Sequence, residues 1–136
     1  VSSTIARNGK IGRPLLYMMN VKSKKTRRLF RDGVERVSPA WSAKNAKIAY
    51  SKRYRGRYVI ATCHPGDPKG TEEVLTKLVG DWEAPSWAPN GRHLICTREL
   101  NGKRELYIID SKTGKRRKVP VSASKPSLAD WSSLNR

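Results

Sequence analysis

The sequence predicts an all-β fold built from a repeated unit, and three observations carry this prediction. Trp41 and Trp87 lie 46 positions apart, and Trp87 and Trp131 lie 44 positions apart. Tyr17 and Tyr107 are separated by 90 positions, which is two periods of 45. No segment shows a sustained helical period. Because a period of about 40–45 residues is typical of a four-stranded propeller blade, we predict a β-propeller segment of about three four-stranded blades, half of a six-bladed propeller.

Each unit is predicted to contain four short strands. The first is a Pro-x-Trp segment, which occurs at Pro39 and again at Pro85. A turn then leads to a second strand at residues 47–51 or 93–97, and the turn that contains Gly91 carries the Asn-Gly pair that favours hairpins. The third strands contain the repeated tyrosines, and the fourth strands are expected at residues 27–31, 73–76 and 116–119.

These strands divide the chain into blades. Residues 1–37 are expected to form an incomplete blade, residues 38–83 and 84–124 two further blades, and residues 125–136 a closing inner strand. Trp41, Trp87 and Trp131 are expected to fill the wedges between blades. Three blades are too few to close a ring, so the closing strand is expected to complete the propeller in a homodimer or with the remainder of a longer chain.

The repeats resemble a known family. Residues 83–91, with the motif Ala-Pro-Ser-Trp-Ala-Pro-Asn-Gly, and residues 106–110 are similar to a complete blade of the TolB-type propellers, whose repeat is Pro-x-Trp-Ser-Pro-Asp-Gly. Trp131-Ser132 is similar to the C-terminal end of that family. One turn departs from the motif, because residues 42–46 have Ser-Ala-Lys-Asn-Ala where the family has Ser-Pro-Asp-Gly.

The resemblance implies a non-enzymatic protein-binding propeller of the periplasm. The family belongs to the Tol-Pal system, so the implied partners are a Pal-like lipoprotein and other Tol components, and the implied role is cell-envelope integrity and protein transport. The N-terminal α/β domain of that family and about half of its six blades have no counterpart in this sequence. Functions that belong to those parts are therefore not carried over.

The net charge leaves a second function open. The chain has 29 Lys and Arg residues against 11 Asp and Glu, a formal net charge of +18. Such a balance attracts anionic partners. The alternative is therefore a propeller that binds an anionic polymer or surface, such as nucleic acid or lipopolysaccharide, through basic loops. Residues 52–58, with interleaved Arg and Tyr, are the best candidate for such contacts, although a solvated loop is the favoured interpretation.

The sequence lacks the residue patterns that catalysis or metal binding needs. His64 and His93 have no partner at ligand spacing, and Cys63 and Cys96 form no Cys-x-x-Cys pair, so no metal site and no cofactor are expected. The sequence lacks a Gly-x-Ser-x-Gly nucleophile elbow, so no catalytic residue is assigned. Both cysteines are expected to be reduced, with Cys96 buried in a second strand. Residues 64–70 are predicted to form an exposed turn, and Gly114 to take a positive φ in a hairpin turn.

The partner-binding surface is predicted where the fourth strand of one blade connects to the first strand of the next. Loops between second and third strands should lie beside these connectors. Trp82 lies off the tryptophan period and is predicted to be an exposed anchor; the alternative, that it packs against its own loop, stays open. The predicted contact residues are Arg36, Val37, Asp81, Trp82, Glu83, Arg53, Arg55 and Arg57.

Overall fold

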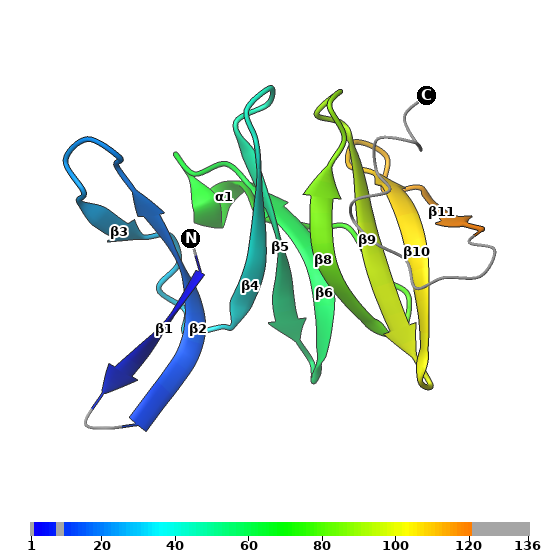
Figure 1. Cartoon of the computed structure of the whole chain (residues 1–136), viewed down its shortest axis with the longest axis horizontal. Coiled ribbons are helices and arrows are strands. Elements are labelled where there is room, and N and C mark those ends of the chain that lie inside the picture. The colour runs from blue at the N-terminus through cyan, green and yellow to red at the C-terminus, as the bar shows by residue number, and fades with distance from the viewer. Residues whose placement is uncertain (1, 8–9, 121–136) are drawn as a thin grey trace.

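Three antiparallel sheets stand side by side in the computed structural model, which describes residues 2–7 and 10–120 (Figure 1). The first sheet consists of β1 (Ser2–Arg7), β2 (Lys10–Met19) and β3 (Thr26–Arg28). The second consists of β4 (Arg36–Ser42), β5 (Lys47–Tyr54), β6 (Arg57–Cys63) and β7 (Glu73–Val74). The third consists of β8 (Asp81–Trp87), β9 (His93–Leu100), β10 (Lys103–Asp110) and β11 (Arg116–Val119). The predicted all-β propeller segment is confirmed; Trp131 and residues 121–136 lie outside the described residues.

Within each sheet the strands follow one another in sequence order, so every connection is local. The links from β5 to β6 and from β9 to β10 are two-residue turns, in which Arg55 and Gly56 have φ of 50° and 82°, and Asn101 and Gly102 have φ of 53° and 78°. Positive φ at both central residues defines the type I′ turn, whose twist matches that of the flanking strands. The predicted polar loop at residues 52–58 is therefore a tight hairpin.

The first strand of each complete sheet contains a β-bulge at the Pro-x-Trp segment. Ser38 and Ala84, which precede Pro39 and Pro85, have φ of 54° and 52°, and the strand register shifts there. A bulge tolerates a proline because the missing N–H falls where the ladder is already interrupted. The strand therefore continues on the other side of the proline and begins at Arg36 or Asp81, earlier than the prolines suggested.

The turns at the end of the sheets opposite the β5–β6 and β9–β10 hairpins differ from one repeat to the next. By the 46-residue spacing Asn45 corresponds to Gly91, but the positive φ lies one residue later, at Ala46 with 50°, whereas Gly91 has a φ of 69°. The degenerate turn therefore still contains a residue in the left-handed region, without a glycine and at a shifted position. The Asp110 side chain accepts hydrogen bonds from the backbone N–H groups of Lys112 and Thr113, and Gly114 has the predicted positive φ, 75°. In the second sheet this connection is longer and contains the one-turn helix α1 (Pro68–Thr71), within the predicted exposed turn.

Two apolar layers fill the spaces between neighbouring sheets. The layer between the second and third sheets includes Cys96, and Trp87 packs against it while its Nε1 donates to the Ala40 carbonyl at 2.9 Å. Trp87 thus lies between blades as predicted. Trp41 borders the groove between the first and second sheets, but 51% of it is exposed, so it fills that wedge less than predicted. Cys63 and Cys96 are buried free thiols on different sheets.

Candidate partner-binding site

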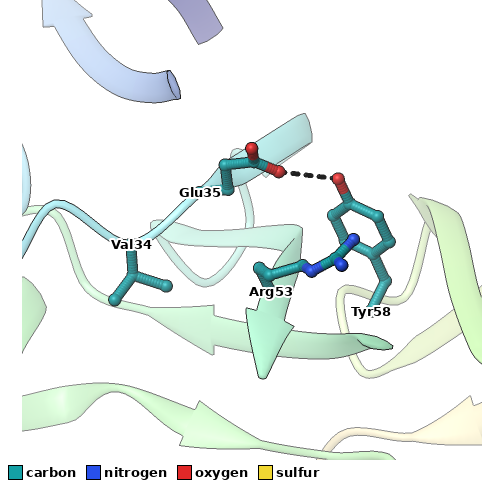
Figure 2. Close-up of a pocket in the computed structure, with 4 residues that line it drawn as sticks. All are labelled: Val34, Glu35, Arg53 and Tyr58. Carbon is teal, nitrogen blue, oxygen red and sulfur yellow. Dashed lines mark hydrogen bonds between the residues drawn. The ribbon is translucent and has the colours of Figure 1, made fainter. Parts of the chain in front are cut away.

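The candidate site is an open cavity of about 550 Å³ lined by Val34, Glu35, Arg53 and Tyr58 (Figure 2). Val34 and Glu35 belong to the connector that leads from β3 to β4. Arg53 and Tyr58 flank the β5–β6 hairpin and pair with each other across it. The cavity therefore lies where the sequence placed the binding surface, at a blade-to-blade connector with a hairpin from second to third strand beside it.

Glu35 connects the two elements of the site. The Tyr58 hydroxyl donates to the Glu35 carboxylate at 2.7 Å, and the Arg53 backbone N–H donates to the Glu35 carbonyl at 3.0 Å. The bond to Glu35 raises the pKa of Tyr58, so its hydroxyl stays protonated at neutral pH. The Arg53 guanidinium lies 5.3 Å from the centre of the Tyr58 ring, and Arg53 is exposed. The cavity thus offers one carboxylate, one guanidinium and one phenol beside the apolar side chain of Val34.

The buried Arg36 fixes the connector from beneath. Its side chain is 1% exposed, and its guanidinium donates to Asp32 at 2.8 and 2.9 Å and to Glu72 at 3.0 Å. The same group lies 3.5 Å from the centre of the Phe30 ring. These contacts hold both ends of the segment that presents Val34 and Glu35.

Glu72 connects this network to the second sheet. It accepts a hydrogen bond from the Tyr50 hydroxyl at 2.5 Å, and it forms ion pairs with Lys52 at 2.5 Å and with Arg36 at 3.0 Å. Burial alone would raise the pKa of Glu72, but these bonds, with that from Arg36 foremost, lower it. The Arg36 bond likewise lowers the pKa of Asp32 to about 2. Both carboxyl groups of the network are therefore ionised at neutral pH.

A second connector lies on the other side of the hairpin. Arg57 donates to the carbonyls of Leu78 at 3.0 Å and Lys77 at 3.4 Å, and the Tyr58 backbone N–H donates to Asp81 at 2.9 Å. Gly80 has a φ of 118°, and an added Cβ there would lie 2.9 Å from Arg98, so only glycine fits this close approach. The hairpin is thus held between two connectors, and we name this side of the molecule the connector face, defined by residues 29–35, 53–58 and 75–80.

The predicted contact residues fall into two groups. Arg53 and Arg55 are exposed on the hairpin, whereas Arg57 is half-buried and bonded to the second connector. Val37, Asp81 and Glu83 are half-buried on the first strands. Their contribution to partner binding stays a prediction. Val34, Glu35 and Tyr58 were not among the predicted contacts, although Glu35 adjoins Arg36 and Tyr58 adjoins Arg57.

The prediction that Trp82 is an exposed anchor is wrong. Trp82 is 0% exposed, its Nε1 donates to the Leu78 carbonyl at 3.0 Å, and its ring meets Tyr107 edge-on at a centroid distance of 4.9 Å. A large ring at the start of a first strand is covered by the neighbouring sheet and by its own connector. The alternative, that Trp82 packs against its own loop, is confirmed. Arg36, another predicted contact, is buried for the same reason.

Neither a metal-binding cluster nor a membrane-spanning helix is found among the described residues. Within residues 2–7 and 10–120, no group of three or more His, Cys, Asp or Glu side chains is placed to hold a metal ion. No helix in the described part of the chain has the length and apolar character to span a membrane.

The fold is that of β-propeller blades, and the connector cavity is its candidate binding site. The family model of the TolB beta propeller domain matches residues 3–135. The chain therefore belongs to the TolB-type β-propeller family.

Relatives and solved structures agree with this family. The chain is 35% identical over 71 residues to the Tol-Pal system protein TolB of Ruthia magnifica subsp. Calyptogena magnifica, a match that covers 52% of this chain and 16% of the relative. The crystal structure of TolB from Acinetobacter baumannii matches 83% of this chain and 28% of its own, with 26% identity and a TM-score of 0.67. A TolB-like structure from Agrobacterium tumefaciens matches 90% of this chain and 42% of its own, with a TM-score of 0.74, and at 16% identity shows the fold alone. The chain thus spans about a sixth of the curated relative.

Proposed function

We propose that this chain is a non-enzymatic binding scaffold of the Tol-Pal system, which docks a Pal-like lipoprotein in the periplasm through the connector face. Family membership and the curated relatives named Tol-Pal system protein TolB support the system. The observation that carries the proposal is the connector cavity, in which Glu35, Arg53 and Tyr58 present charges of both signs and an aromatic ring. Tyr and Arg are the side chains that most often carry the binding energy of protein interfaces.

Rigidity of the site supports docking of a folded partner. Arg36 anchors the connector, and Arg57 anchors the hairpin to the next connector, so the cavity exists before the partner arrives. A preformed surface loses little conformational entropy on binding, which leaves more of the contact energy as affinity.

The test is binding of the soluble domain of the Pal-like lipoprotein from the same genome, measured by isothermal titration calorimetry. Arg53→Ala and Tyr58→Ala should each weaken binding about fivefold or more, because a contact residue at the centre of an interface contributes more than about 1 kcal/mol. Lys44→Ala, an exposed basic residue at the opposite end of the sheets, is the matched control and should leave affinity unchanged. Unchanged affinity in both cavity variants, with native melting temperatures, would refute the proposed site.

Binding of an anionic polymer through this face has less support. Within residues 52–58, Arg57 already donates to a backbone carbonyl and the Tyr58 hydroxyl already donates to Glu35. Glu35 also places a negative charge inside the cavity, which disfavours a polyanion there. A salt titration separates the two interpretations, since polyanion binding falls steeply with salt through counterion release. A protein interface with an apolar centre weakens much less.

A further inference from the structure

The end of the sheets opposite the connector face carries more positive than negative charge. One connection that leaves it, residues 64–72 between β6 and β7, contains the exposed Asp67 as well as Lys69 and the Arg36-bonded Glu72. Four other loops lie at that end of the three sheets: residues 20–25 between β2 and β3, 43–46 between β4 and β5, 88–92 between β8 and β9, and 111–115 between β10 and β11 (Figure 1). Their sequences contain no aspartate or glutamate. Six exposed lysines lie in them, and we name this surface the lysine face: Lys22, Lys24, Lys25, Lys44, Lys112 and Lys115.

Backbone and side-chain contacts join three of these four loops, those of the second and third sheets. The Asn45 amide donates to the Gly91 carbonyl, which joins the second sheet to the third. The Ser111 backbone N–H donates to the Arg92 carbonyl at 3.0 Å, which joins the last two loops. Asp110, at the end of β10, is the nearest carboxylate along the chain to Lys112 and Lys115, and Arg92 already pairs with it at 2.7 Å. Among the ion pairs of the described residues none involves one of the six lysines, so their charges add up to a positive layer.

The connector face mixes the two signs of charge more closely. There, the exposed Arg53 lines the cavity with Glu35, and Asp32 pairs with Arg36; at the same end of the third sheet Arg104 pairs with Glu99 at 3.4 Å. The six lysines of the lysine face instead lie in loops that have no acidic residue of their own. A basic surface with one sign of charge concentrates anions at its own side of the molecule.

We propose that the lysine face binds the surface of an anionic lipid bilayer. The lysines project from several loops at one end of the sheets, an arrangement that fits a flat layer of headgroup phosphates. Val21, at the tip of the β2–β3 loop between Asn20 and Lys22, is 82% exposed. An exposed apolar side chain beside lysines is typical of segments that enter the headgroup region. Nucleic-acid surfaces instead combine basic residues with stacking aromatic rings, and these four loops contain none.

The experiment is co-sedimentation of the purified protein with vesicles of phosphatidylcholine alone and of phosphatidylcholine mixed with phosphatidylglycerol. Binding is expected only to the mixed vesicles and should weaken as salt is raised. Lys112→Gln/Lys115→Gln removes two charges from the lysine face, and Lys103→Gln/Arg104→Gln removes two from the opposite end of the same sheet. The first pair should weaken binding about 25-fold, at roughly fivefold per lysine, and the second pair only slightly.

Three results would overturn the proposal. The first is equal binding to both kinds of vesicle, and the second is no binding to either. The third is an equal loss from both double variants, which would show that net charge and not the lysine face drives association. Single-stranded DNA that binds more tightly than the mixed vesicles would identify a nucleic acid as the ligand. Lys24→Gln/Lys25→Gln in the β2–β3 loop gives a second, independent variant should the first lower the melting temperature.

Discussion

Replacing Arg36 by alanine tests the argument that a buried charge network builds the connector face. The substitution removes a bidentate pair with Asp32 and an ion pair with Glu72. Hydrogen bonds to charged groups contribute about 1.5–3 kcal/mol each, but burying a guanidinium costs several kcal/mol, so most of this gain cancels. Removing one partner of a buried ion pair typically costs about 3–5 kcal/mol.

The surroundings of Arg36 place this cost at the lower end. Glu72 keeps Lys52 and Tyr50 as partners, and Asp32 is 47% exposed at its side chain, so water replaces the lost bonds there. The expected loss is about 3 kcal/mol, including the contact with the Phe30 ring, or roughly 10 °C in melting temperature.

Thermal and urea unfolding followed by circular dichroism measure this loss. Arg53→Ala removes the same side chain from the exposed hairpin and should change stability by less than about 0.5 kcal/mol. Arg36→Met should fall between the two, because methionine still packs on Phe30. A loss below about 1 kcal/mol for Arg36→Ala would mean that the network does not stabilise the connector, and the reasoning would fail.

Further predictions concern backbone strain, acidity and the thiols. Ala46→Gly should raise the free energy of unfolding by about 0.5–1 kcal/mol, because Ala46 has a φ of 50°; the urea midpoint should rise with the slope unchanged, and a lower midpoint would contradict this. The pKa of Asp32 is lowered from 3.8 to about 2 and that of Glu72 is lowered from 4.5, so their contribution to stability is present above these ordinary values and lost as pH falls toward 2. Glu72→Gln should flatten that loss in melting temperature against pH, and an unchanged profile would count against it. Burial raises the pKa of Cys63 to about 11 and also raises that of Cys96, so both thiols should react with a thiol reagent only on unfolding; rapid labelling of the native protein would refute this.

Much of the fold could be predicted because the repeated unit contains residues with strong local structural preferences. The Trp41–Trp87 spacing located the first strands, and Asn90-Gly91 located a hairpin. The bulges were missed because a proline in a strand suggests a strand start, whereas the positive φ of the preceding residue lets the strand continue. Because the strand continues past the bulge, Arg36 is the first residue of β4 and not part of the connector.

The position of the candidate site could be predicted, but its lining could not. Propeller topology places connectors and hairpins together, and the structure brings Glu35 of the connector and Arg53 of the hairpin to one cavity, whose role in binding stays a prediction. Which side chains are buried depends on contacts distant in sequence: Arg36 meets Glu72, 36 positions away, only when the long connection through α1 folds across the first two sheets. Trp82 was misassigned because its departure from the tryptophan period indicated exposure, although the same 46-residue spacing that relates Trp41 to Trp87 relates Arg36 to Trp82.

That equivalence explains how the two connectors differ. Arg36 pairs with Lys52 across the β4–β5 ladder as Trp82 pairs with Arg98 across β8–β9, and both side chains are almost completely buried. Trp82 holds its connector by one hydrogen bond to Leu78 and by ring packing, interactions that do not titrate. Arg36 holds its connector through two carboxylates, so only this connector loses its anchor when they are protonated. Because the cavity of Glu35 and Arg53 lies on the connector held by Arg36, partner binding should weaken with acidity before the sheets themselves unfold.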